Sequence, residues 1–149
     1  MLLSPEDHDL LQLHMFMHFG YVMVVIDKQP YRLHRIILQR LYPYTDISLY
    51  QCDHINNDRS DNRRVNLRLC TGSQNNINRP KMKKITTSIY KGVSRERRRP
   101  RWRACITVNK CRQHIGYYDT ELGAAIAYNE RAVRYYGDFA TINRIKIKV

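Results

Sequence analysis

The chain has 149 residues, of which 43% are hydrophobic, and a formal net charge of +13. Residues 1–78 hold eight basic and eight acidic residues, whereas residues 79–149 hold eighteen basic and five acidic ones. This length suits one ordinary domain or two small ones, and a strongly basic second part indicates a polyanionic partner, with a merely solvated basic surface as the alternative.

Composition also argues against several classes of protein. The four cysteines form no Cys-x-x-Cys pair, which argues against a zinc knuckle and favours a reducing compartment. The apolar run from Met15 to Ile26 is too short to span a bilayer, and residues 1–10 lack the basic start of a signal peptide. We therefore expect a cytoplasmic protein with no membrane partner and no small-molecule substrate.

The first predicted element is a helix that begins at Ser4-Pro5, with Ser at the N-cap and Pro at the first helical position. Its predicted face carries Leu10, Leu11, His14 and His18. Two histidines four residues apart on a helix can bind a metal, but no third ligand is evident, so a packed or exposed pair is the preferred interpretation.

A strand is predicted over residues 21–26, where the sequence is rich in β-formers and ends in a turn at residues 27–30. Residues 31–33 are consistent with a returning strand. An apolar helical face follows over residues 33–41, and Tyr42-Pro43 ends it.

The most informative stretch runs from Tyr50 to Arg79. An apolar run that starts at Ile47 ends in Asp53-His54, a polar loop follows over residues 55–65, and residues 67–69 alternate as a second strand. Thr71 and Gln74 have the spacing of a capping box, so a helix carrying Asn75, Asn76 and Asn78 is expected to begin there.

The side chains of this stretch suggest a particular chemistry. Carboxylate and amide oxygens suit Mg²⁺ or Mn²⁺ rather than zinc, and a histidine is a general base near neutral pH. A metal on a phosphate oxygen together with a base for water is what phosphodiester hydrolysis needs. The alternative is an Asx-rich turn that joins two strands for local reasons.

The motifs of this stretch resemble those of the HNH endonucleases, especially the phage and intron homing enzymes. The resemblance rests on Asp53-His54-Ile55-Asn56, Asp61-Asn62-Arg63, Asn66-Leu67-Arg68 and Ser73-Gln74-Asn75-Asn76, with His34-Arg35-Ile36-Ile37 upstream. It implies a ββα-metal fold that cleaves double-stranded DNA with Mg²⁺ or Mn²⁺.

The resemblance also implies roles for individual residues. Asp53 and Asn75 would hold the metal, His54 would activate water, and Asn66 would brace the loop and orient His54. His34 and Arg35 would contact DNA phosphate, although packing at the helix start explains His34 equally well. Asn57 stands where the family often has Gly, so a left-handed backbone is expected there.

The basic part begins with residues 79–87, predicted to be a linker that tracks the phosphate backbone. Three strands are predicted over residues 90–96, 101–108 and 111–118, and a helix over residues 121–136. Trp102, Ala104, Ile106 and Val108 would face that helix, and Arg101, Arg103, Cys105 and Thr107 the opposite side. On the helix itself, the predicted shared face carries Leu122, Ala125, Ile126, Val133 and Tyr136.

These elements resemble the Apetala/ethylene-response-factor DNA-binding domain, which lays its sheet in the major groove. The resemblance rests on Tyr90-Lys91-Gly92-Val93, Trp102-Arg103-Ala104-Cys105-Ile106, Ile115 to Thr120, Ala124 to Tyr128, and Gly137 to Asn143. By motif, Lys91, Arg101, Arg103 and Arg112 match its DNA-contacting or sheet-face positions. We also expect DNA contacts from Arg95, Arg97, Lys110 and His114. Ser94, Glu96 and His114 depart from the plant pattern, so the plant target sequence is not transferred.

The sequence thus predicts an α+β protein with a ββα-metal nuclease domain over residues 1–78, a linker over 79–87, a sheet-and-helix DNA-binding domain over 88–143 and a basic tail over 144–149. Its expected activity is metal-dependent, site-directed hydrolysis of DNA by a monomer that nicks one strand. The alternatives are a DNA-binding regulator with a degenerate nuclease domain and a restriction or colicin-like nuclease.

Overall fold

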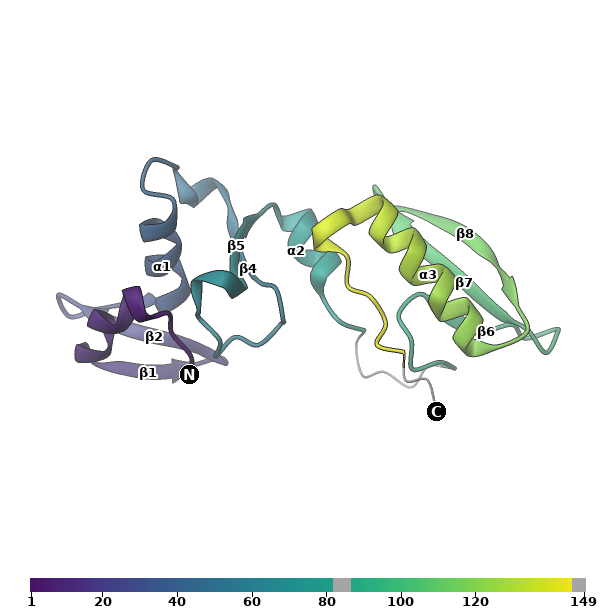
Figure 1. Ribbon diagram of the computed structural model, residues 1–149, viewed down its shortest axis with the longest axis horizontal. Helices are drawn as coiled ribbons and strands as arrows, with labels where there is room; N and C mark the ends of the chain where they lie inside the picture. The colour runs from purple at the N-terminus through teal and green to yellow at the C-terminus, as the bar shows by residue number, and fades with distance from the viewer. Residues whose placement is uncertain (82–86, 146–149) are drawn as a thin grey trace. The chain divides into compact units, whose positions relative to one another are not determined.

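The computed structural model describes residues 1–81 and 87–145 and divides into two compact units, Met1–Asn76 and Ile77–Val149. Both units combine short helices with small antiparallel sheets, so the α+β class is confirmed (Figure 1). Most of the predicted linker, residues 82–86, and most of the tail, residues 146–149, lie outside the described residues. Within the described ranges, no helix is long and apolar enough to cross a membrane.

The N-terminal unit opens with a 3-10 helix, Pro5–Gln12, and a three-stranded sheet of β1 (Met15–His18), β2 (Tyr21–Ile26) and β3 (Gln29–Arg32). The predicted helical face of His14 and His18 is wrong, because His18 lies in β1 and His14 just before it. Four residues of a strand span about 13 Å, which is too far for the two rings to share one metal ion.

Helix α1 (Leu33–Leu41) follows β3 directly and supplies most of the first core. Its three fully buried residues pack with strand β2 and with Leu67 of the next hairpin. The core members are Leu10, Val22, Val24, Leu33, Ile37, Leu38, Ile47 and Leu67. The predicted helix at residues 33–41 is confirmed, and its buried face anchors the polar hairpin that comes next.

That hairpin pairs β4 (Gln51–His54) with β5 (Leu67–Cys70) in antiparallel register, and α2 (Gly72–Asn78) follows. The predicted start of the first strand at Ile47 is too early, since residues 47–49 form a 3-10 helix. The capping box is confirmed: the Thr71 amide donates to Gln74 Oε1 at 2.8 Å, and the Gln74 amide donates to Thr71 Oγ1 at 3.2 Å. The predicted ββα order is therefore present.

The C-terminal unit is a sheet of β6 (Val93–Arg95), β7 (Trp102–Val108) and β8 (Cys111–Tyr118) covered by α3 (Glu121–Tyr136) (Figure 1). Thr120 accepts a hydrogen bond from the Gly123 amide at the start of α3, and Gly137 ends it at a φ of +52°. These boundaries match the predicted ones, except that β6 is shorter than the predicted strand over residues 90–96.

The sheet keeps the predicted alternation of β7 because its irregularity lies on β8. The register passes from Ala104↔Gly116 to Cys105↔His114, so Ile115 is the extra residue and β7 has none. The inward side chains of β7 pack on α3, while Arg103, Cys105 and Thr107 point away from it. One face of the sheet is thus left uncovered by α3.

The predicted buried face of α3 needs correction. Ile126 and Val133 are exposed, at 42% and 54%, whereas Ala124, Ala125, Tyr128 and Ala132 are buried. Three alanines allow the helix axis to approach the sheet closely, which leaves the bulkier aliphatic side chains on its outer side. Gly92 permits a similar approach, because a Cβ there would lie 2.0 Å from the ring of Tyr128.

Candidate active site

Asp53 and His54 lie at the end of β4 and are both buried, with 3% and 6% of their surfaces exposed. Their cross-strand partners on β5 are Arg68 and Leu67. Because alternate residues of a strand point to opposite sides, the carboxylate and the imidazole leave the backbone in different directions. Burial of two polar side chains at one strand end requires partners for each, and both are present.

Arg68 is the cross-strand partner of the Asp53 carboxylate. Its Nε and Nη2 lie 2.8 and 2.7 Å from Asp53 Oδ2, with 15% of the Arg68 side chain exposed. The Nε contact is a hydrogen bond between ionised partners, a class that is short and strong, and the Nη2 contact is an ion pair. The pair therefore holds Asp53 in one orientation at the end of the strand.

His54 is held from the loop that follows it. Its Nε2 lies 3.3 Å from Oδ1 of Asn62, a residue that is fully buried. An amide oxygen accepts a hydrogen bond, so this contact selects the tautomer that carries its proton on Nε2 and leaves Nδ1 as the basic nitrogen. Burial lowers the pKa of His54 below its ordinary value of 6.5, which keeps the ring neutral at pH 7.

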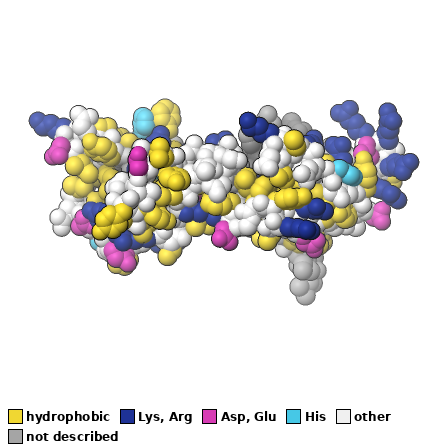
Figure 2. Space-filling view, turned by 90° about the horizontal axis from the view of Figure 1, so that it is seen from above, with side chains coloured by type: hydrophobic (Ala, Val, Ile, Leu, Met, Phe, Trp, Pro, Cys, Tyr) yellow, Lys and Arg dark blue, Asp and Glu magenta, His cyan; other side chains and the backbone are white. Residues whose placement is uncertain are grey.

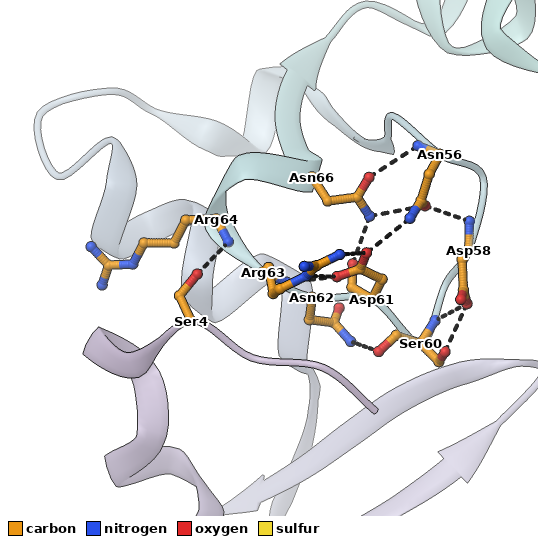
Figure 3. Close-up of polar contacts among 9 residues, drawn as sticks. All are labelled: Ser4, Asn56, Asp58, Ser60, Asp61, Asn62, Arg63, Arg64 and Asn66. Atoms are coloured by element: carbon orange, nitrogen blue, oxygen red, sulfur yellow. Dashed lines mark hydrogen bonds and ion pairs between the residues drawn. The ribbon is translucent and has the colours of Figure 1, made fainter.

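Asn66 closes the loop between the two strands (Figure 3). Its Oδ1 accepts from the Asn56 amide at 3.0 Å, and its Nδ2 donates to Asn56 Oδ1 at 3.0 Å and to the Asp61 carbonyl at 2.7 Å. Asn57 adopts the predicted left-handed backbone, with φ of 63°. Asn66 thus makes its contacts within the loop, while the loop residue whose side chain contacts His54 is Asn62.

Carboxylates inside the loop serve the loop itself. Asp61 binds the guanidinium of Arg63, at 2.8 Å to Nε and 2.7 Å to Nη2, and these contacts lower the pKa of its carboxyl to about 2. Asp58 accepts from the amide and the hydroxyl of Ser60. Figure 3 shows these side chains turned toward one another within the loop. The loop is therefore a closed polar network.

The N-terminal segment fastens this loop from outside. Leu2 forms an isolated parallel β-bridge with Asp61. The Ser4 hydroxyl accepts a hydrogen bond from the Arg64 amide at 2.8 Å. Asp7 is fully buried and binds Arg64 at 2.7 Å and Arg40 at 3.2 Å. Hydrogen bonds from Arg64 are the main reason that the pKa of Asp7 is lowered. Residues far upstream therefore stabilise the loop that positions His54.

Asn75 lies on α2, and its Nδ2 donates to Gln51 Oε1 at 2.8 Å. Gln51 is two residues before Asp53, so both side chains leave β4 on the same side. Asp53 and Asn75 therefore present a carboxylate and an amide oxygen from neighbouring elements, and both are hard donors of the kind Mg²⁺ binds. This donor set fits a divalent metal, although the contact with Arg68 shows that a metal and an arginine would share Asp53.

Two residues predicted to contact DNA have packed positions in the N-terminal unit. His34 is buried, and its ring centroid lies 5.2 Å from that of His54 in an edge-on contact. Burial, with smaller electrostatic effects of His54, Arg32 and Arg35, lowers the pKa of His34 to about 3. Arg35 donates to the carbonyls of Ile47 and Tyr50, both at 2.8 Å, and fastens the turn before β4.

Two of the predicted DNA contacts in the C-terminal unit also have internal partners. The Lys91 ammonium donates to the Ile77 and Arg79 carbonyls, at 2.7 Å each, and burial lowers its pKa to about 8. The Arg95 guanidinium lies 5.9 Å from the centroid of the Trp102 ring.

The other predicted DNA contacts lie at the uncovered side of the sheet or its turns. Arg103 faces Ser94 and Tyr117 across the sheet, and His114 stacks at 4.6 Å on Tyr117. Exposed cations extend this surface at the turns and on β8, namely Arg97, Arg101, Lys110 and Arg112. A pocket at the edge is lined by Glu96, Arg98, Arg99, Arg101 and Tyr117. Figure 2 shows Lys and Arg side chains gathered at the end of this unit.

The sequence analysis did not assign roles to several residues near His54. Asn62 stood within a recognised motif, but a loop sequence gives no direction for its side chain. Tyr21, Arg32 and Arg59 carry no motif, and they come close only because β2, β3 and the loop meet in space. Tyr21 lies 6.5 Å from His54, ring centroid to ring centroid.

Comparisons with known proteins agree with this geometry. Residues 31–77 match the family model described as HNH endonuclease. A protein of Acanthamoeba polyphaga mimivirus, named as an uncharacterised HNH endonuclease, is 32% identical over 143 residues, which cover 95% of this chain and 63% of the relative. The chain thus spans less than two thirds of that relative's length.

Plant proteins match a smaller share of the chain. The AP2-like ethylene-responsive transcription factors AIL7 and PLT2 of Arabidopsis thaliana are 40% and 39% identical over 67 residues, which cover 38% of this chain and 14% and 12% of those proteins. No solved structure matches. Residues 31–77 are thus similar to the HNH endonuclease family, and the ββα order of this part of the chain agrees with that similarity.

Proposed function

We propose that the protein is a divalent-metal-dependent endonuclease that hydrolyses a phosphodiester bond of double-stranded DNA. The observation that carries the proposal is the buried Asp53-His54 pair at the end of β4, with His54 held by Asn62 and Asn75 facing the same side of β4 as Asp53. The HNH family match supports it.

In this mechanism Nδ1 of His54 takes a proton from the attacking water. Nε2 keeps its own proton and donates it in a hydrogen bond to Asn62 Oδ1. The lowered pKa of His54, caused by burial, keeps the ring in the neutral form that accepts a proton. Asn66 acts through the loop by fixing the backbone that carries Asn62. A metal held by Asp53 and Asn75 would supply positive charge to the phosphate and the leaving 3′ oxygen.

Site selection is assigned to the C-terminal unit. Its uncovered sheet face carries Arg103 and its edges carry Arg101 and Arg112, and the similarity to AP2-like transcription factors supports a role in reading DNA. We infer a homing-type arrangement in which a monomer with one Asp53-His54 site nicks one strand. In this arrangement the linker assigned to residues 79–87 connects the unit that cleaves DNA to the unit that recognises the DNA site.

The test is cleavage of supercoiled plasmid by the full-length protein with and without Mg²⁺. Wild-type protein should convert plasmid to the nicked form only with the metal, and Asp53→Ala should abolish conversion. Asp27→Asn, at an exposed turn of the same unit, is the matched control and should cleave normally. Equal cleavage by Asp53→Ala, or cleavage in excess EDTA, would refute the assignment.

A second candidate is a non-catalytic DNA-binding regulator. The contact between Arg68 and Asp53 favours it, because an arginine then takes the place of a metal beside that carboxylate. The same assay separates the two functions, since a regulator retards plasmid in a gel but leaves it supercoiled with every divalent ion. Arg68→Gln would restore no activity to such a protein.

A further inference from the structure

Two exposed arginines of the N-terminal unit, Arg32 and Arg59, have no carboxylate partner. Arg40, Arg63, Arg64 and Arg68 each form an ion pair with an aspartate. Arg35 donates hydrogen bonds to two backbone carbonyls. Within residues 1–76, all of which are described, Arg32 and Arg59 form no ion pair, so the balanced charge of this unit conceals a local positive surplus.

Both of these arginines gather on one aromatic ring. The Arg59 guanidinium carbon lies 4.4 Å from the centroid of Tyr21, and that of Arg32 lies 5.0 Å from it. Arg59 also donates from Nη1 to the Phe19 carbonyl at 3.3 Å, which directs it across the turn between β1 and β2. A ring face attracts a guanidinium, and this attraction holds two like charges at one place.

This ring stands beside the candidate catalytic histidine. Its centroid lies 5.2 Å from that of His34 and 6.5 Å from that of His54. Positive charge at Arg59 contributes to the lowered pKa of both histidines, after the larger effect of burial. Arg32 and Arg59 are exposed, whereas the histidines are buried, so the surplus faces solvent next to the pair that would attack phosphate.

Two neighbouring cations without a counter-ion repel each other, and this cost is removed when an anion binds between them. Arginine suits the purpose, because its planar group donates two parallel hydrogen bonds to one phosphate. We propose that Arg32 and Arg59, held on the ring of Tyr21, form a clamp for a backbone phosphate of the substrate DNA beside His54. This inference rests on the proposed function, and it assigns substrate positioning to residues outside the metal and base set.

The test compares full-length wild type with Arg32→Gln, Arg59→Gln and the double variant. Lys28→Gln is the matched control, because Lys28 is an exposed cation in the turn between β2 and β3, at the end of β2 away from Tyr21. DNA binding is measured without divalent metal at several salt concentrations. Each lost phosphate contact should reduce the slope of log K against log salt by about 0.9, whereas the control should keep the wild-type slope.

Single-turnover cleavage at saturating DNA with Mg²⁺ is the second measurement. The double variant should cleave roughly 10²-fold more slowly because the phosphate is no longer held in position. Arg32→Lys/Arg59→Lys should keep the wild-type slope but cleave more slowly, since lysine preserves charge without the paired hydrogen bonds. Melting curves of each variant identify any loss of folding. If the glutamine variants do not fold, the double variant Arg32→Lys/Arg59→Lys decides whether the paired hydrogen bonds matter for cleavage.

The outcomes separate the two levels of the proposal. A double variant with the slope of Lys28→Gln would overturn the clamp, even if wild-type protein cleaves. A reduced slope with unchanged cleavage would overturn its position beside the scissile phosphate. If wild-type protein fails to cleave any plasmid, the proposed nuclease function fails, and the slope alone still decides whether these arginines bind phosphate.

Discussion

The two units use arginine in opposite ways. In the N-terminal unit, eight basic residues balance eight acidic ones, and four of its seven arginines form ion pairs around a buried polar loop. Among the described arginines of the C-terminal unit, Arg101 forms an ion pair, a 3.6 Å contact with the exposed Asp119. An ion-paired arginine fixes structure, whereas an unpaired arginine at the surface remains available to a phosphate.

This contrast indicates that the two units have different roles. Buried, internally satisfied polar groups hold His54 and Asp53 in place, which is what chemistry at a fixed position requires. Exposed cations on a rigid sheet suit recognition of a long polyanion. The exceptions in the first unit, Arg32 and Arg59, lie where the proposed chemistry meets the substrate.

His54→Ala should separate catalysis from binding most strongly. Loss of a general base lowers a rate by roughly 10²–10⁴-fold, while the cationic face that binds DNA is untouched. Plasmid nicking and gel retardation are measured on the same samples, with His14→Ala, an exposed histidine of the same unit, as control. A variant that nicks at the wild-type rate would exclude His54 as the base.

Asp7→Ala should destabilise the N-terminal unit by about 3 kcal/mol, because it leaves Arg64 and Arg40 without their shared, fully buried partner. Asp9→Ala is the control: Asp9 pairs with Arg40 at the surface, where solvent screens the pair, so its loss should change stability little. Denaturant unfolding gives both values. Equal effects of the two substitutions would show that burial of Asp7 is not what secures the loop.

Arg103→Ala should weaken discrimination between DNA sites by roughly 1–3 kcal/mol if Arg103 contacts a base edge. Its place on the uncovered face of β7 motivates this expectation. Competition binding with a selected site and with scrambled DNA measures it, with Arg134→Ala on α3 as the control. The same loss for every sequence would instead assign Arg103 to the phosphate backbone.

Acid should destabilise the N-terminal unit in two overlapping pH windows. The pKa of His34 is about 6.5 when unfolded and about 3 when folded, so the unfolded state binds more protons as the pH falls below 6.5. Stability should therefore decrease by up to about 1.4 kcal/mol per pH unit for this group, and the lowered pKa of buried His54 adds to the loss.

A second loss should begin below about pH 4, where Asp7 and Asp61 take up protons and release their arginines. Unfolding measured at pH 7.5, 5 and 3.5 covers both windows. His34→Gln should flatten the first window and leave the second unchanged. Stability that stays constant from pH 7 to 5 in the wild type would show that His34 titrates normally.

Local patterns in the sequence were enough to predict many elements. The Thr71–Gln74 capping box, the start of α3 after Thr120 and its end at Gly137, and the left-handed Asn57 are all confirmed. Each of these features depends on contacts or backbone preferences within a few residues. Such features can be predicted without knowledge of the tertiary structure. The alternation of β7 was predictable for the same reason.

Tertiary structure decided what the local signals left open. The segment around His14 and His18 is part of a sheet, because β2 supplies hydrogen bonds that cannot be predicted from the local sequence. The position of His34 against His54, the contact of Asn62 with His54 and the meeting of Arg32 with Arg59 on Tyr21 all join residues from separate elements. The sequence by itself determined which groups carry the proposed chemistry, whereas packing decided which of them face one another, since side-chain direction depends on the surrounding fold.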